Sequence, residues 1–391
     1  MAGLRLAVLD DGLFVRTYAG TIHPVAATFH RFVEAVARSR AFQSVRYVIP
    51  VRSLRIWEND PSLPAVDESV LDVVPTASFS GIADYLARSA YMLARNWPII
   101  DRAISESDLV WLRLPASNAP IALLAARRHS VPYFGWVAGS VGDVVRAQKR
   151  HPPLAWVARA IGAGYDEVTH LAARGGPVMS LDGKLFNSVI TGEQVAASRL
   201  RELAVDGPPW RIAWAGRMAG EKGLPVLFEA VRMLLDGGLD MELLMIGDGP
   251  ERQRVESLAA DLPVGRVRLC GYVGDPEAYL DLLRSAHVLA HPSGAEAVPK
   301  VVGEAMAAGL PIVASDVGAV REILGAGERG RLIPPGDPHA LAESIRGLLT
   351  DPDERRTLRE RGLDWAADHT AERQADRMID WARQEFPRLP W

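Results

Sequence analysis

Two glutamates, Glu296 and Glu304, flank the start of a predicted helix that follows an apolar strand. Pro299 suits the first helical turn because its missing N–H group costs nothing there, and Gly309 followed by Pro311 marks the helix end. The free N–H groups of a helix start lie at the positive end of its dipole and favour a bound phosphate. The stretch therefore predicts an anion site bordered by two carboxylates.

A basic loop precedes this helix in the chain. Arg217 and Lys222 follow the predicted strand 211–215 on a loop flanked by glycines. Arginine offers a planar fork of donors and lysine a compact charge, and both suit the negative charge that builds on a departing diphosphate. Loops of this kind also bind structural sulfate or cap a strand, which is the alternative interpretation.

A family resemblance rests on these residues. Glu296 together with the run EAMAAGLP, residues 304–311, resembles the donor-site signature of retaining GT-B-fold glycosyltransferases of family 4, the glycosyl transferases group 1. Residues 215–217 with 221–223, then 246–250 and 271–273, are similar to the family's other motifs and stand in the same order. The resemblance covers residues 210–350 and is weak in the first half of the chain.

The resemblance implies an α/β fold with two Rossmann-like doubly wound domains facing a cleft, the GT-B architecture. It assigns catalysis to Arg217, Lys222 and Glu296, with Glu296 at the transferred sugar, and the ribose hydroxyls to Glu304. No metal site is expected. The expected donor-binding residues are Gly216, Arg217, Lys222, Gly247, Tyr272, Val273, Glu296, Ala297, Val298, Pro299, Lys300, Val301, Val302 and Glu304. The N–H groups of Val301 and Val302 would serve the diphosphate. The simpler alternative interpretation of Glu304 is that it is an exposed glutamate on a helix.

The sequence departs from the family in several places. Ala297 and Val298 replace the usual glycine and aromatic residue, which predicts a sugar pocket of different shape. In the first half, 136–139 lacks the histidine that often follows the fifth strand. Gly20, His23 and Arg113 are the candidates for acceptor binding, although a lone His or Arg in a loop is more often a surface or capping residue.

Apolar runs alternate with helical patterns along the whole chain, which predicts doubly wound parallel sheets. The predicted domains are an acceptor-binding domain over 1–192 and a nucleotide-sugar-binding domain over 193–368. The polar, proline-ended segment 192–209 is the expected boundary, and residues 10–22 are an expected loop. By the resemblance, a final helix within 369–391 crosses back to the first domain, with Trp391 as its anchor.

Composition excludes several classes of protein. The net charge of −4 gives no basic field for nucleic acid, and no apolar run is long enough for a membrane span. Cys270 is the single cysteine, so no intramolecular disulfide forms, and a cytoplasmic location is expected. No His/Cys cluster has metal-ligand spacing. The segment 139–176 is interpreted as a solvated helix over an apolar core, with a peripheral membrane contact as the alternative.

The resemblance implies a retaining hexosyltransferase whose co-substrate is a UDP- or GDP-sugar, and no cofactor is expected. The acceptor is a small molecule, a glycan or a lipid-linked compound, and the oligomeric state is left open. Two alternatives remain at this point, a GT-B-fold nucleotide-sugar epimerase and a donor-binding protein without catalysis. The reduced match in the first half keeps the second alternative open.

Overall fold

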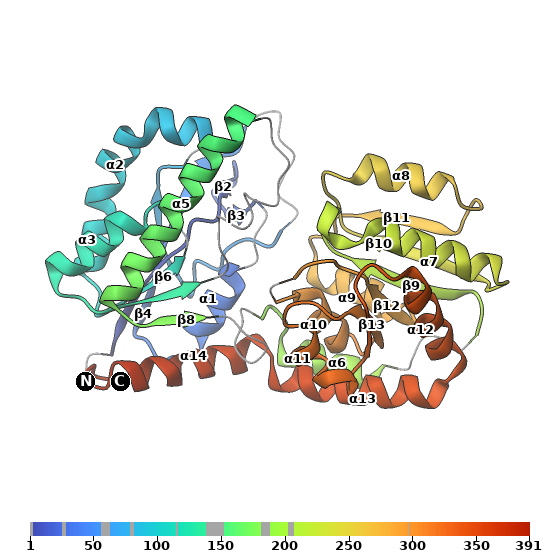
Figure 1. Ribbon diagram of the computed structural model, residues 1–391. Helices are drawn as coiled ribbons and strands as arrows, with labels where there is room; N and C mark the ends of the chain where they lie inside the picture. The colour runs from blue at the N-terminus through green and yellow to red at the C-terminus, as the bar shows by residue number, and fades with distance from the viewer. Residues whose placement is uncertain are drawn as a thin grey trace. The chain divides into compact units, whose positions relative to one another are not determined.

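The computed structural model describes residues 3–25, 29–55, 63–78, 82–114, 116–137, 152–180, 188–201, 207–296 and 298–391 (Figure 1). Contacts divide the chain into two compact units. Unit 1 comprises Met1–Leu181 and Gln374–Trp391, and unit 2 comprises Asp182–Arg373. Both are α/β units, as the sequence predicts.

Unit 1 is built on a mainly parallel sheet of eight strands within the described residues. The strands are β1 (Arg5–Leu9), β2 (Phe14–Arg16), β3 (Ile22–Pro24), β4 (Ser44–Ser53), β5 (Asp72–Thr76), β6 (Leu109–Leu114), β7 (Tyr133–Val137) and β8 (Val178–Ser180). Their order is β3-β2-β4-β1-β6-β7-β8, with β5 also paired to β4. Only the β2–β3 pair is antiparallel among these pairings.

Helices cover both faces of this sheet (Figure 1). They are α1 (Phe29–Arg38), α2 (Ile82–Ser105), α3 (Ala119–His129), α5 (Pro152–Gly175) and, from Gln374 onward, α14 (Ala371–Glu385). On one face Trp111 packs between Phe29 of α1 and Phe134, which in turn contacts Trp381 of α14 at a centroid distance of 5.4 Å. Residues of α2, α3 and α5 form the apolar core on the other face.

Unit 2 holds a parallel sheet of six strands in the order β11-β10-β9-β12-β13-β14. The strands are β9 (Trp210–Ala215), β10 (Met241–Ile246), β11 (Val267–Gly271), β12 (Val288–His291), β13 (Ile312–Ser315) and β14 (Arg331–Ile333). The helices are α6 (Gly192–Leu200), η1 (Gly220–Lys222), α7 (Leu224–Asp236), α8 (Arg252–Ala260), α9 (Pro276–Arg284), α10 (Lys300–Ala307), α11 (Val320–Ile323), η2 (Gly325–Gly327), α12 (Pro338–Thr350) and α13 (Pro352–Asp368). Residues of α7, α8 and α12 pack on the face that carries Ile212, Trp214 and Met245.

Some sequence expectations need correction. Residues 10–22 are not one loop, because β2 and β3 form a hairpin there, with the Val15–His23 pair at its centre. Pro24 ends β3, and the next helix, α1, starts at Phe29. Such short elements carry too few residues for a periodic signal.

The unit boundaries also differ from the predicted ones. The first lies at residues 181/182 rather than 192/193, because α6 belongs to unit 2. Thr191 caps this helix with a complete capping box, and Arg199 on it pairs with Asp364 of α13 at 2.6 Å. The second boundary lies at 373/374 rather than 368/369. Trp391 contacts Phe42 of unit 1 at a centroid distance of 5.7 Å.

No helix in the described part of the chain is long and apolar enough to cross a lipid bilayer. Within the segment 139–176, for which a peripheral membrane contact is the alternative interpretation, Arg146, Lys149 and Arg150 lie outside the described residues, and so do the side chains of 152–162.

Candidate active site

The predicted donor motifs of unit 2 gather at the carboxyl ends of two neighbouring strands. β9 and β12 pair in parallel, so the loop after Ala215 and the loop after His291 emerge at the same sheet edge. From β9 the chain proceeds to β10 on one side, whereas β12 leads to β13 on the other. This is the switch point at which open α/β sheets bind ligands.

Backbone contacts fix the two loops against each other. Ser293 Oγ and Gly294 N donate to the carbonyl oxygen of Glu221 at 3.0 and 2.8 Å. Gly223 has a φ of 65°, and a Cβ atom there would lie 1.9 Å from the carbonyl oxygen of Pro292. A glycine is therefore required at the end of the basic loop, and it places Lys222 beside the second loop.

The approach of these loops joins Lys222 to Glu296. Lys222 Nζ donates to Glu296 Oε1 at 2.6 Å, and the two side chains are 21% and 9% exposed. His291 Nε2 lies 3.1 Å from the same oxygen, and its side chain is 2% exposed. Burial raises the pKa of the Glu296 carboxyl, but His291 and Lys222 outweigh this effect and hold the pKa at about 2. Glu296 is therefore an anion under ordinary conditions.

Sequence reasoning did not select His291. The signal was its position, because it is the last residue of a buried strand and directly precedes the loop that carries Glu296. Its contact with the carboxylate arises only when that loop folds back toward the strand end, so a linear motif does not reveal it.

Arg217 lies on the same loop as Lys222 but is exposed, and it makes no ion pair with any described residue. The backbone beneath it is closely packed. A Cβ atom at Gly247 would lie 2.0 Å from the carbonyl oxygen of Gly216, and Gly216 itself has a φ of 147°. The glycines at 216 and 247 thus let the loops after β9 and β10 touch, with Arg217 directed to solvent.

Glu304 lies on α10 and is bound by a residue that the sequence analysis did not select. Tyr279 of α9 donates its hydroxyl to Glu304 Oε2 at 2.8 Å. Burial, followed by the charge of Glu304, raises the pKa of Tyr279 well above its usual range. Tyr272, after β11, is 53% exposed, and burial and the Glu304 charge raise its pKa as well. Tyr272 and Val273 thus follow the carboxyl end of β11, as predicted.

The helix start differs in detail from the expectation. α10 begins at Lys300, and Pro299 is the residue before it rather than part of its first turn. The Val302 N–H donates to the Pro299 carbonyl oxygen at 3.2 Å, so it is not the unengaged diphosphate donor that the sequence predicts. Val298 and Val301 are partly buried, while Ala297 lies outside the described residues.

The acceptor candidates of unit 1 have structural partners. Gly20, with a φ of 90°, lies in the turn of the β2–β3 hairpin. The ring nitrogens of His23 lie 2.8 Å from the Leu63 carbonyl oxygen and 3.0 Å from Thr21 Oγ1. Arg113 binds Asp10 at 2.6 Å. These contacts are enough to explain the placement of the His23 and Arg113 side chains without a bound acceptor. Acceptor binding by Gly20, His23 and Arg113 stays a prediction.

Comparison with protein families identifies the part of the chain that carries these residues. Residues 198–365 match the family described as Glycosyl transferases group 1. That segment belongs to the glycosyl transferases group 1 family. The match includes Arg217, Lys222, Glu296 and Glu304, which confirms the resemblance inferred from the motifs.

Curated relatives that match this glycosyl transferases group 1 segment are named for different glycosyl-transfer activities. The chain is 39% identical over 162 residues to a phosphatidyl-myo-inositol mannosyltransferase of Mycobacterium leprae, covering 41% of this chain and 40% of the relative. It is 29% identical over 205 residues to a D-inositol 3-phosphate glycosyltransferase of Corynebacterium urealyticum, covering 51% and 48%. The chain spans at most about half the length of these curated relatives.

Solved structures match nearly the whole chain. A sucrose-phosphate synthase of Thermosynechococcus elongatus has a TM-score of 0.67 at 19% identity and covers 99% of this chain and 100% of its own. HepE of Anabaena, solved with UDP and glucose, has a TM-score of 0.61 at 14% identity and covers 97% and 99%. At these identities the likeness shows the fold alone. The chain as a whole, and not only the group 1 segment, therefore has the GT-B fold.

Proposed function

We propose that this chain is a retaining, metal-independent glycosyltransferase of family 4. It transfers a hexose-type sugar from a UDP- or GDP-sugar to a nucleophilic group of an acceptor, such as a hydroxyl. The glycosidic bond to the diphosphate breaks, a bond from the acceptor oxygen to the anomeric carbon forms, and the hydroxyl proton is released with the nucleoside diphosphate. Unit 2 binds the donor, and unit 1 selects the acceptor.

The observation that carries this proposal is the shared environment of Lys222 and Glu296. Lys222 and His291 contact the ionised Glu296 carboxylate at the switch point of the sheet, in the loop that leads to the start of α10. A diphosphate would compete with Glu296 for Lys222, and Arg217 remains unpaired among the described residues to supply a second cation. This arrangement suits a leaving diphosphate, whose charge must be met by fixed donors.

Glu296 would then remain ionised after Lys222 turns to the diphosphate, because His291 still lies beside it. We assign it to the transferred sugar, whose hydroxyl groups are suitable donors to a carboxylate. Glu304 would accept hydrogen bonds from the ribose hydroxyls. The order of the motifs supports these roles, and so do the relatives, which are named as a mannosyltransferase and a glycosyltransferase.

The relatives suggest two acceptors. Relatives named for phosphatidyl-myo-inositol and D-inositol 3-phosphate make these the first two acceptors to test. A lipid-linked acceptor would require a peripheral membrane contact, and the single Cys270 favours a cytoplasmic location.

An incubation of the wild-type protein with UDP-glucose, GDP-mannose and each of the two acceptors tests this proposal. Formation of a glycoside with the donor's anomeric configuration and release of equal nucleoside diphosphate is expected. Formation of an epimeric donor would instead assign an epimerase. Tight nucleotide binding without turnover would leave a donor-binding protein, and an inverted product would contradict the retaining mechanism.

A further inference from the structure

Helix α9 carries a tyrosine hydroxyl that donates a hydrogen bond to Glu304 of α10. Tyr279 donates to Glu304 Oε2 at 2.8 Å, from one helix to the next. Burial and the neighbouring Glu304 carboxylate raise the pKa of Tyr279 well above its usual range, so its hydroxyl stays protonated at neutral pH. Tyr279 can therefore act as a permanent donor to this carboxylate.

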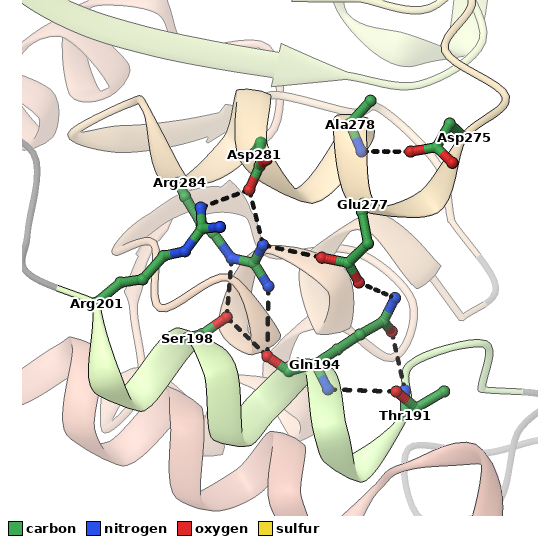
Figure 2. Close-up of polar contacts among 9 residues, drawn as sticks. All are labelled: Thr191, Gln194, Ser198, Arg201, Asp275, Glu277, Ala278, Asp281 and Arg284. Atoms are coloured by element: carbon green, nitrogen blue, oxygen red, sulfur yellow. Dashed lines mark hydrogen bonds and ion pairs between the residues drawn. The ribbon is translucent and has the colours of Figure 1, made fainter.

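Helix α9 is itself held firmly at its C-terminal end. Figure 2 shows Arg284, whose side chain is 6% exposed, between α9 and α6. Its Nε donates to Ser198 Oγ at 3.0 Å, and its Nη2 donates to the Gln194 carbonyl oxygen at 3.3 Å. Within α9, its Nη1 donates to Asp281 at 2.9 Å. One nearly buried guanidinium thus ties the end of α9 to α6.

The N-terminal half of α9 is fixed as well. Asp275 caps the helix by accepting from Ala278 N at 2.7 Å. Glu277 accepts from Gln194 Nε2 of α6 at 2.9 Å, as Figure 2 shows. Tyr279 lies between these contacts and the Arg284 network, so the turn of α9 that carries it is held against α6 on both sides.

We propose that Tyr279 is a positioning residue for donor recognition, which orients the Glu304 carboxylate toward the vicinal hydroxyls of the donor ribose. This inference rests on the proposed function. A free glutamate side chain must lose rotational freedom when it binds a ligand, and a side chain already held by a hydrogen bond loses less. Tyr279 therefore increases the affinity only for ligands that present ribose hydroxyls.

The test measures binding rather than turnover. UDP and GDP are titrated calorimetrically into the wild type, and the tighter of the two is compared with its 2′,3′-dideoxy form in each variant. Tyr279→Phe should weaken binding of the ribonucleotide by about three- to tenfold, the size of one hydrogen-bond contribution. Binding of the dideoxy form should change by less than about twofold, because its ribose offers nothing to Glu304.

Tyr133→Phe is the matched control. It removes another largely buried tyrosine hydroxyl, which donates to the Ala172 carbonyl oxygen at 3.3 Å in unit 1. Both nucleotides should bind this variant as they bind the wild type. In a Glu304→Gln background, Tyr279→Phe should add little further loss, because the group it orients has already changed.

The outcomes separate the inference from the function on which it rests. If Tyr279→Phe changes the affinities for the ribonucleotide and the dideoxy form by the same factor, the ratio of the two affinities stays as in the wild type, and the positioning role is overturned. Full additivity with Glu304→Gln would overturn it too. A wild type that binds neither UDP nor GDP would instead overturn the proposed function, and this is visible before any variant is compared.

Discussion

Lys222 Nζ lies 2.6 Å from Glu296 Oε1, although the two residues come from loops after different strands. His291 reaches the same oxygen from the end of β12. The ion pair forms because β9 and β12 are neighbours and Gly223 lets the basic loop pass close to Pro292. Glu296 thus pairs with the cation that the proposed function assigns to the donor diphosphate.

Removal of either loop cation should slow the transfer. Arg217→Ala and Lys222→Ala are each expected to lower kcat by roughly two to three orders of magnitude, the usual loss for one stabiliser of developing charge. Arg356→Ala removes an exposed arginine of α13, whose partner is Asp353, and should leave kcat unchanged. Initial rates with saturating donor measure the effect, and near-normal rates for both loop variants would refute the leaving-group role.

The Glu296 ion pair should contribute to stability in a pH-dependent way. Its pKa of about 2 lies below the ordinary 4.5, so the ionised form stabilises the fold above pH 4.5 and this contribution is lost as the pH falls toward 2. Glu296→Gln should therefore be less stable than the wild type by up to about 3 kcal/mol at pH 7, with a difference that shrinks in acid.

Urea denaturation at pH 7, 4 and 3 measures this difference in unfolding free energy. Glu328→Gln, which alters a glutamate whose side chain is 72% exposed, is the control and should show almost no pH-dependent difference. A Glu296→Gln effect of the same size at pH 7 and pH 3 would mean that the carboxylate is not held ionised by its partners.

Gly223 should not tolerate a side chain. Gly223→Ala places a Cβ atom 1.9 Å from a backbone oxygen at a φ of 65°, so the loop must move and the protein should lose about 2–4 kcal/mol of stability. Gly220→Ala on the same loop meets nothing within 4 Å and is the matched control. A thermal unfolding midpoint that falls equally in both variants would show that the close approach to Pro292 is not what requires glycine.

The sequence was sufficient to predict the two α/β units and to select the candidate residues that belong to contiguous motifs. Arg217, Lys222, Glu296 and Glu304 each follow a strand or start a helix within a recognisable run, so their approximate placement follows from local pattern. Tyr279 was not predicted, because its contact with the site depends on how α9 packs against α10 and its own surroundings carry no motif.

Short or capped elements explain the remaining differences. Three-residue strands such as β2 and β3 are too short to show alternation, and their pairing is a tertiary event. The polar sequence of α6 suggested a linker, whereas its capping box and its contacts with α9 place it in unit 2. Arg113 was selected for an acceptor, but its contact with Asp10 is set by the pairing of β1 with β6.

Activity should persist when divalent metals are removed. In the proposed mechanism, Lys222, Arg217 and the start of α10 would supply the positive charge that a metal ion brings to other diphosphate reactions. Turnover in excess EDTA should therefore stay within about twofold of the untreated rate. Complete loss with chelator that Mg²⁺ or Mn²⁺ restores would contradict a metal-independent mechanism.

Glu304→Gln should affect the donor and spare the acceptor. Loss of the charge weakens the hydrogen bonds from the ribose hydroxyls, so the donor KM should rise by about tenfold or more while the acceptor KM stays nearly constant. A 2′,3′-dideoxy donor should be poor for the wild type and scarcely worse for the variant. Unchanged discrimination between the two donors would leave Glu304 as an ordinary surface glutamate of α10.

A calorimetric titration of UDP and GDP into the wild type and Lys222→Ala addresses the donor site without any need to know the acceptor. The wild type should bind one of the two nucleotides, and Lys222→Ala should bind it about ten- to a hundredfold more weakly, the contribution of one charge-assisted hydrogen bond. Arg356→Ala should bind as the wild type does. Equal affinity in the wild type and Lys222→Ala would contradict a diphosphate site at the carboxyl ends of β9 and β12.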